Sequence, residues 1–430
     1  ITVKKHMLST LFVGVDVSLR SQHAVMLDFY GEQLASFPFP NNASGASFLI
    51  SEIIKHASLA DATHVVVAME STSFYSFHLC NYLFESLELA ALHTKVYCLN
   101  PKVTKAYQNT FVDVDKDDPH DAYGIADFAR IGKITSKPFQ GAQFVALQRL
   151  TRARLHLVEN LSREKSYVLT NIFIKFSELA AISVKEPDCP FSNKFGATSM
   201  AVLEEMSPDE IAYASLDELI DFLMKKGKGR FTDPEAKAKL LQRAARDSYR
   251  LDKALYEPLS AAIAASFNCI KALETEIKTV DKAIEKAVGG LASNEYQCLL
   301  SIKGFGPVIS AGLIAEIGFI SRFPSEEKLA KFAGLTWRKK QSGTFTSDIT
   351  YMTKSGNQYL RYYLGEAVMS LLKNHNSEYT AFYRKKYDEA IRFKHKRALA
   401  LTSRKLVRLI FALLRDNRLY TNEKERMKAI

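Results

Sequence analysis

Four acidic residues in the first third of the chain have the type and spacing of a metal-binding carboxylate site. Asp16 ends an apolar run that begins at Phe12, and Glu70 ends a second apolar run. A carboxylate at the end of a buried strand is costly unless it faces a cleft or holds a cation. Asp118 and Asp121 stand three residues apart at the start of an expected helix, which puts both on one helix face.

These carboxylates predict chemistry at a phosphodiester. Four hard oxygen ligands suit Mg²⁺ or Mn²⁺, and two such ions would clamp the attacking and leaving oxygens. Each residue also has a structural interpretation. Asp118 belongs to an acidic turn, Asp121 would favour the helix dipole, and Asp16 or Glu70 could pair with a lysine. The position of all four at two strand ends and one helix start favours the metal interpretation.

The elements that would position these residues form an α/β pattern. Apolar, β-rich runs cover residues 11–17, 24–29, 33–39, 64–69 and 95–99, and helical stretches cover 44–57, 74–88 and 119–131. Pro119 falls in the first turn of the last helix, where its missing N–H costs nothing. Such an order makes a mixed sheet flanked by helices, which is typical of a ribonuclease-H-like fold. We expect this catalytic domain to span residues 7–140, with Met7 as its start.

Long helical patterns fill the middle of the chain. They cover about 142–180 and about 236–288, the second interrupted at Pro258 and ended by Gly289 and Gly290. Segments typical of loops and linkers lie between them, at 184–195 and 225–234. Two such helices predict either a stalk that joins subunits or a plain helical bundle. We expect a helical stalk or linker with an insert over residues 141–292.

A second module, expected to be mostly α-helical, spans residues 293–430. Its start predicts a helix, a Gly304-Phe-Gly306 turn and a second helix. In a helix-hairpin-helix these glycines would let backbone N–H groups approach a phosphate, because no side chain obstructs them. A tight turn between two packed helices is an equally good interpretation. Further along, residues 336–350 form an irregular segment rich in Ser, Thr and Gly.

Composition points to a polyanionic partner. The formal net charge is +11 on 430 residues, and basic residues concentrate at 225–230, 338–340 and 384–408. Nucleic acid is the simplest partner for such a charge, although one basic run alone is usually a solvated helix face. The five cysteines have neither paired nor zinc-ligand spacing. Without an apolar run of ~18 residues or a secretory signal, we expect a cytoplasmic protein with no membrane contact.

Short motifs at both ends of the chain, but not in its middle, resemble one family. The pieces are Gly14-Val-Asp16-Val-Ser, Glu70-Ser-Thr, Lys116-Asp-Asp118-Pro-His-Asp121-Ala122, Ile302-Lys-Gly-Phe-Gly-Pro, Phe332-Ala-Gly-Leu-Thr, Gln341-Ser342-Gly343 and Lys354-Ser-Gly-Asn-x-x-Leu-Arg361. In this order and spacing they are similar to the DEDD insertion-sequence transposases of the IS-one-ten family, also called bridge recombinases. The chain departs from that pattern at Asp117, Ser73 and Trp337, where Thr, Gly and Pro are usual.

The resemblance implies a RuvC-like DEDD domain in front of a serine-bearing transposase domain. It implies that Asp16, Glu70, Asp118 and Asp121 bind the metal, and that Ser342 forms a covalent serine–DNA link. It also implies a non-coding bridge RNA that pairs with double-stranded donor and target DNA. The family acts as homo-oligomers, so a dimer or tetramer with shared active sites is expected. Sequence chemistry alone does not select Ser342, since Ser beside Gly is usually a turn residue.

Motif glycines, polar residues and basic residues of the second module are the expected nucleic-acid contacts: Gly304, Gly306, Lys339, Lys340, Lys354, Asn357, Arg361, Arg397 and Arg404. Two other functions remain open at this point. A structure-selective nuclease, such as a junction resolvase, would use the four carboxylates to activate water and would form no covalent bond. A non-catalytic nucleic-acid-binding protein would use only the Gly-x-Gly turn and the basic helices.

Overall fold

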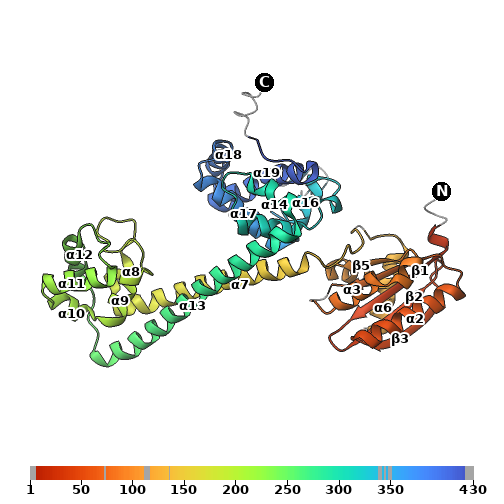
Figure 1. Ribbon diagram of the computed structural model, residues 1–430, viewed down its shortest axis with the longest axis horizontal. Helices are drawn as coiled ribbons and strands as arrows, with labels where there is room; N and C mark the ends of the chain where they lie inside the picture. The colour runs from red at the N-terminus through yellow and green to blue at the C-terminus, as the bar shows by residue number, and fades with distance from the viewer. Residues whose placement is uncertain are drawn as a thin grey trace, which may run out of the picture. The chain divides into compact units, whose positions relative to one another are not determined.

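The computed structural model describes residues 6–71, 74–110, 117–134, 136–337, 341–342, 345–346 and 351–421 (Figure 1). Contacts between residues divide the chain into two compact units, residues 1–143 and 144–430. The first unit contains a five-stranded sheet, and the second is almost wholly helical in its described part.

The sheet of the first unit is mixed and has the strand order β3-β2-β1-β4-β5. Its strands are β1 (Thr10–Val17), β2 (Ser21–Leu27), β3 (Gln33–Pro40), β4 (His64–Glu70) and β5 (Lys95–Leu99). The first three pair antiparallel, whereas β4 runs parallel to both β1 and β5. The helices are α2 (Ala43–Leu59), α3 (Phe77–Glu85), α4 (Leu87–Ala91), α5 (Pro101–Gln108) and α6 (Asp118–Arg130). This confirms the predicted mixed α/β architecture.

Two details of the first unit differ from the sequence-based expectation. The helix expected over 74–88 is two helices, because Ser86 leaves the helical conformation and caps α4, which begins at Leu87. Its side chain accepts a hydrogen bond from the N–H of Leu89 in the first turn of α4. Helix α5 was not expected at all. It begins at Pro101 after Asn100, whose side chain accepts from the N–H of Lys102.

Alternation along the central strands divides their side chains between two apolar cores. One core takes Val13 and Val15 of β1 and packs them against α2 and α3. The other takes Phe12 of β1 and Ala68 of β4 and packs them against α6. Residues two apart on a strand face the same side, so the α6 side of the sheet continues toward the ends of both strands.

Helix α6 lies unusually close to β1 at Gly14. A Cβ atom built on Gly14 would lie 2.1 Å from the carbonyl oxygen of Ala122 and 2.4 Å from the backbone nitrogen of Ala126. Both alanines are buried, and their small side chains permit the contact from the helix side. Glycine at this position therefore lets the helix backbone rest on the strand.

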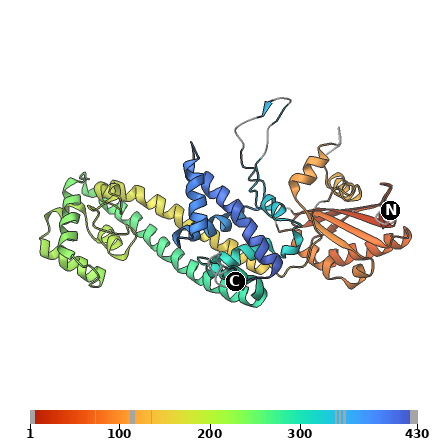
Figure 2. The ribbon, with the colours of Figure 1, turned by 90° about the horizontal axis from the view of Figure 1, so that it is seen from above.

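Two long helices of the second unit, α7 (Val145–Lys175) and α13 (Lys253–Leu291), pack side by side (Figures 1 and 2). Ion pairs join Arg154 to Asp281 and Lys165 to Glu274. Residue numbers rise along α7 as they fall along α13, so the pair is antiparallel. The two long helices expected from the sequence are present.

The predicted break at Pro258 is wrong. Pro258 lies inside α13, and the interruption falls earlier, between α12 (Pro234–Asp247) and Lys253. Pro258 is the sixth residue of α13, beyond the first four N–H groups, so it removes one backbone hydrogen bond, the one that an N–H would donate to the carbonyl of Ala254. Gly289 and Gly290 do not end the helix either, since α13 continues to Leu291.

The segment between the long helices is more structured than the linker-like sequence suggested. It forms α8 (Ser177–Ala181), α9 (Ala197–Glu205), α10 (Pro208–Tyr213), α11 (Leu216–Gly227) and α12, which share an apolar core with parts of α7 and α13. Reciprocal capping boxes begin two of these helices, Ser207 with Glu210 and Ser215 with Glu218. Such capping lets short helices form in a Pro- and Gly-containing segment.

The remaining part of the second unit has its own apolar core, built mainly from α15, α17 and α19. Its elements are α14 (Ser293–Leu300), α15 (Pro307–Ile317), η1 (Ile320–Arg322), α16 (Glu326–Phe332), β6 (Gln341–Ser342), β7 (Phe345–Thr346), α17 (Gln358–Lys373), α18 (Ser377–Asp388) and α19 (Lys394–Asp416). None of the described helices of the chain is long and apolar enough to cross a membrane.

Replacing Gly14 with alanine is expected to destabilise the first unit by about 3 kcal/mol, because the new methyl group would overlap the α6 backbone, which cannot move away without losing its core. Hydrogen-exchange mass spectrometry of β1 and α6 peptides in the full chain measures this. Gly289→Ala is the matched control, since nothing lies within 4 Å of the added methyl. Unchanged protection of β1 and α6 in Gly14→Ala would contradict the close contact.

Candidate active site

Strand register brings Asp16 and Glu70 to the same edge of the sheet. In the parallel pairing of β1 and β4, Gly14 lies opposite Ala68 and Val15 opposite Met69. One residue further along both strands, Asp16 lies level with Glu70. By alternation both carboxylates are on the α6 side, in line with Gly14 and Ala68. Each side chain is half-buried.

The first turn of α6 supplies Asp118 and Asp121. Asp117 caps the helix, because its carboxylate accepts the N–H of His120 at 2.9 Å. Asp118 is exposed and Asp121 is half-buried. The positive end of the helix dipole favours carboxylates at this place. The contact of α6 with β1 at Gly14 thus carries these two acids toward the strand end that bears Asp16.

The electrostatics of Asp16 show that the four acids share one region. Burial is the main reason that the pKa of Asp16 is raised, to about 6. The negative charges of Asp121, Asp118 and Glu70 raise it further, in that order of size. Like charges oppose ionisation only when they lie near one another. The structure therefore brings together all four acidic residues that the sequence singled out.

The same acids do not meet at one point. Within the described part of the chain, no three His, Cys, Asp or Glu side chains lie close enough to hold one metal ion together. Coulomb repulsion acts over longer distances than a metal–oxygen bond of about 2.1 Å. The three other acids therefore lie within Coulombic range of Asp16 without forming a closed ligand set, and the donor set, oxygen alone, suits a hard divalent cation.

Two neighbours of the carboxylates escaped the sequence analysis. Thr104 of α5 is buried, and its hydroxyl donates a hydrogen bond to the Glu70 carboxylate. His23 of β2 pairs directly with Asp16, and its Nε2 lies 2.8 Å from the hydroxyl of Ser36. Burial lowers the pKa of His23, against the opposing effect of Asp118 and Asp117. The sequence could have indicated His23, because it lies in the strand that directly follows Asp16. No sequence pattern indicated Thr104, because α5, the helix that carries it, was not expected.

Ser342 lies in the second unit, on β6 of a short antiparallel pair. Its backbone pairs with Phe345 of β7, and its side chain lies outside the described residues. The pair is part of a segment whose two ends meet at the Trp337–Met352 bridge. Next to this bridge the hydroxyls of Thr336 and Thr353 are 3.1 Å apart. Lys339 and Lys340, expected to bind nucleic acid, also lie outside the described residues.

Two motif glycines form the base of the Ser342 segment. Gly334 has φ +71°, and a Cβ on Gly356 would lie 2.5 Å from the backbone nitrogen of Gly334. The backbones of the two motifs are therefore in contact. Arg361, expected to bind nucleic acid, donates to the carbonyl of Ala333 at 2.8 Å, and burial lowers its pKa. In this structure its guanidinium supports the same base.

A buried polar network extends from this base to α7. The side chain of Asn357 caps α17 by accepting the N–H groups of Tyr359 and Leu360. Its amide nitrogen donates to the buried carboxylate of Glu316 at 2.7 Å. Arg152 of α7 donates to both oxygens of Glu316, each at 2.8 Å. Asn357, predicted as a nucleic-acid contact, thus has a structural role that its motif did not reveal.

The other predicted nucleic-acid contacts differ in accessibility. Gly304 has φ +106° and packs against Ser370 of α17 and against Asn374, which follows that helix, whereas nothing lies within 4 Å of a Cβ on Gly306. Lys354 and Arg397 are exposed. Arg404 is half-buried with its Nη1 buried, and burial is the main reason that its pKa is lowered.

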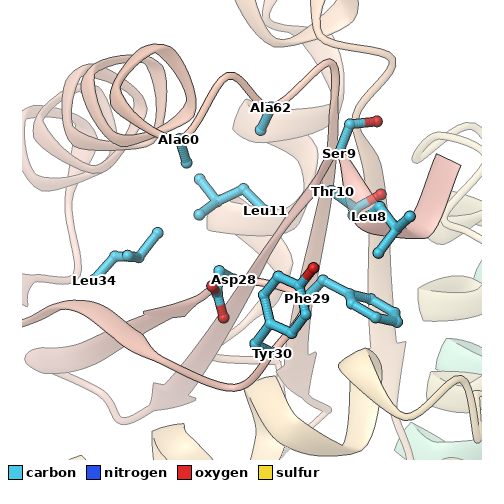
Figure 3. A pocket seen from close by; sticks show the side chains of 10 residues that line it. All are labelled: Leu8, Ser9, Thr10, Leu11, Asp28, Phe29, Tyr30, Leu34, Ala60 and Ala62. Carbon is cyan, nitrogen blue, oxygen red and sulfur yellow. The ribbon is translucent and has the colours of Figure 1, made fainter. Parts of the chain in front are cut away.

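A small pocket of about 250 Å³ lies at the other end of the sheet (Figure 3). Its lining includes Leu8, which precedes β1, Thr10 at the start of β1, and Asp28 and Tyr30 after β2. Asp16 and Glu70 stand at the opposite, carboxyl ends of β1 and β4, where ligands bind in open α/β sheets. The pocket is therefore separate from the carboxylates.

Comparisons with known proteins match two parts of the chain to transposase families. Residues 13–173 match the sequence model of the DEDD transposase family named for IS110, and residues 296–384 match that of the transposase IS116/IS110/IS902 family. The chain carries the DEDD domain and the C-terminal domain of IS110/IS116/IS902 transposases. The four acids all fall in the first match, and Ser342 falls in the second.

Individual relatives extend the likeness over nearly the whole transposase. A 42 kDa protein of insertion element IS900 from Mycobacterium paratuberculosis is 25% identical over 418 residues, 96% of this chain and 98% of its own. A mini-circle protein of Streptomyces coelicolor, named as a transposase for IS117, is 25% identical over 342 residues, 78% of each chain. The chain is therefore an enzyme of DNA strand transfer, and its DEDD domain implies a divalent metal requirement.

Replacing Asp16 with asparagine is expected to stabilise the metal-free transposase. A carboxyl group with a folded pKa of about 6 and an ordinary value of 3.8 destabilises the fold when it is ionised. That cost is absent below about pH 4, grows as the pH rises toward 6, and is complete above it. Because the site is partly solvated, we expect it to reach only about 1 kcal/mol.

Hydrogen exchange of β1 and α6 peptides, measured without divalent ions, tests the pH dependence. Asp16→Asn should protect these peptides better than the wild type does at pH 8, and the difference should disappear at about pH 4. The exposed Glu85 offers a control, Glu85→Gln, for the loss of one negative charge. A stabilisation that grows as the pH falls would have the wrong sign for repulsion among the carboxylates.

Proposed function

We propose that this transposase cleaves and rejoins DNA with Mg²⁺ or Mn²⁺ at Asp16, Glu70, Asp118 and Asp121, and with Ser342 as the nucleophile. The observation that carries the metal part is geometric: strand register sets Asp16 level with Glu70, and the packing of α6 on Gly14 brings the helix start with Asp118 and Asp121 to the same side of the sheet. Burial, and after it the charges of the three other acids, raise the pKa of Asp16 accordingly. Four carboxylates in one region oppose folding unless a cation neutralises them. Their gathering on one side of the sheet is therefore best explained by a cation-binding role.

Residues around the carboxylates hold this arrangement in place. When bound, the divalent ion neutralises charge on the phosphate and stabilises the departing oxygen. Thr104 fixes one oxygen of Glu70 by hydrogen bonding. Asp117 fixes the start of α6 and so the direction of Asp118 and Asp121. The exposed Asp118 is the ligand best placed to exchange with solvent.

Ser342 would attack the phosphodiester through its hydroxyl oxygen. A new oxygen–phosphorus bond forms as the bridging DNA oxygen leaves, so the serine proton is lost and the leaving oxygen gains one. The number of phosphoester bonds is unchanged, which allows rejoining without an external energy source. Support for this role comes from the motif around Ser342 and from the close backbone contact of Gly334 with Gly356 at the base of its segment.

We further propose partners and an assembly for this activity. Donor and target duplex DNA would pair with a guide non-coding RNA, and α7 with α13 would join protomers into a dimer or tetramer with shared active sites. The proposed parts are residues 7–140 for metal chemistry, 141–292 for assembly and 293–430 for strand exchange. Open space at Gly306 and exposure of Lys354 and Arg397 favour these as phosphate contacts, Gly306 within a helix-hairpin-helix.

Ser342→Ala is expected to abolish the DNA–protein complex that survives denaturation, while DNA binding is retained. Asp121→Ala should also abolish it, because the phosphate is then no longer activated. Ser355→Ala, in the exposed motif after the segment, is the control and should form the complex normally. Mass spectrometry of the trapped adduct locates the modified residue. If Ser342→Ala cleaves DNA as well as the wild type does, the protein is a nuclease that uses water. If the wild type binds DNA without cleaving it, the protein is non-catalytic.

A further inference from the structure

The turn between α18 and α19 exposes two large apolar side chains. Ile391 is 92% exposed, more than any other large hydrophobic residue of the described chain, and Phe393 is 77% exposed. Ala390, in the same turn, is buried and so anchors the turn between the two helices. A scattered exposed apolar residue needs no explanation, but two at the tip of one anchored turn form a local apolar surface.

Phe393 also has an unfavourable backbone conformation. Its φ is +53° and its ψ is +38°, in the left-handed region. A bulky aromatic residue is rare there, and glycine or asparagine would adopt this conformation at lower cost. Phe393 precedes Lys394, the first residue of α19, and its side chain makes no capping hydrogen bond. The fold therefore gains nothing local from an aromatic residue at this position.

Positive charge surrounds this tip. Exposed basic side chains come from both helices and from the turn: Arg384, Lys385, Arg392, Lys394, Lys396 and Arg397. Two acids, Asp388 and Glu389, lie in the same stretch, and Glu389 is paired with Lys386 at 2.6 Å. The net positive field at the tip repels a second copy of the same tip and attracts a polyanion.

Aromatic rings line the side of the tip. The rings of Tyr383 and Tyr387 are 6.0 Å apart, and the Tyr383 hydroxyl lies 2.6 Å from Nδ1 of His395. The ammonium group of Lys394 lies 5.7 Å from the centre of the Tyr387 ring. Aromatic rings interleaved with cations are the combination that binds unpaired nucleotides, because the rings stack on bases while the cations contact phosphates.

We propose that the α18–α19 tip, defined as Ile391 to Arg397, binds unpaired nucleotides, with Phe393 stacked on a base and Ile391 packed beside it. Arg392, Lys396 and Arg397 would contact the flanking phosphates. Strand exchange separates paired strands, so unpaired bases arise during the established activity of this chain. The proposal does not depend on Ser342 or on the carboxylates. Unpaired DNA and unpaired RNA offer the same chemistry and are separated by the test.

Equilibrium binding of the full chain to matched oligonucleotides tests the proposal. The probes are one single-stranded sequence as DNA, the same sequence as RNA, and the corresponding DNA duplex. Phe393→Ala should weaken single-strand binding about tenfold, the loss expected for one stacked base, and should leave duplex binding nearly unchanged. Phe393→Trp should restore the affinity. Tyr213→Ala, at another highly exposed aromatic residue (86%), should bind as the wild type does.

Salt dependence separates stacking from charge at the tip. Phe393→Ala should keep the slope of log affinity against log salt, whereas Lys396→Ala with Arg397→Ala should flatten it by about 1.4 on single strands. A 2-aminopurine base in the probe should lose fluorescence with the wild type and not with Phe393→Ala. The nucleic acid with the larger loss on Phe393→Ala is the one that the tip binds.

Three results would overturn the proposal. Phe393→Ala could bind single strands as tightly as the wild type does. It could lose single-strand and duplex binding equally, which would mean a general effect on phosphate contacts. Finally, Ile391→Ala and Phe393→Ala could change the sedimentation of the free protein, or its binding to anionic lipid vesicles, and leave nucleic-acid binding intact. In that case the tip is a protein or membrane contact.

Discussion

The closeness of α6 to β1 at Gly14 is the constraint on which the carboxylate site depends. Strand pairing alone places Asp16 beside Glu70. The other two acids reach them only because a helix backbone lies directly on the strand, where a single methyl group would prevent it. Once the helix is there, the acids repel one another, and this repulsion adds to the effect of burial in raising the pKa of Asp16. Packing in the first unit thus stabilises a charge arrangement that is unfavourable by itself.

The second unit holds the two ends of the Ser342 segment in a different way. The Ser342 segment begins and ends at a base where two glycine-containing motifs touch. Asn357 connects this base to the buried Glu316, and Arg152 connects Glu316 to α7. Buried charge of this kind is costly unless every partner is satisfied, so the network holds its members in one arrangement. Helix α7 and the base of the Ser342 segment are consequently joined by one polar network.

Sequence patterns predicted the first unit better than the second. Strand ends carry their own signal, since an acid that follows an apolar run marks the edge of a sheet, and Asp16 and Glu70 both did so. Long-range packing carries no such signal. Asn357 and Arg361 look like phosphate contacts in the sequence, yet their side chains bond to Glu316 and to the Ala333 carbonyl.

Pro258 looked like a helix break, but packing of α13 on α7 outweighs the lost hydrogen bond. The role proposed for Ser342 came from resemblance to a family, because a serine beside a glycine has no distinctive local chemistry.

The central claim is that Asp16, Glu70, Asp118 and Asp121 surround the space that a catalytic divalent cation occupies. Anomalous X-ray diffraction from crystals of the transposase grown with Mn²⁺ tests this claim most directly, because it locates the ion without reference to activity. The account predicts an anomalous peak on the α6 side of the sheet, within about 2.2 Å of oxygens from at least two of these carboxylates. The peak should be absent in crystals of Asp16→Asn. A peak bound by other residues, or none at a concentration that supports cleavage, would contradict it.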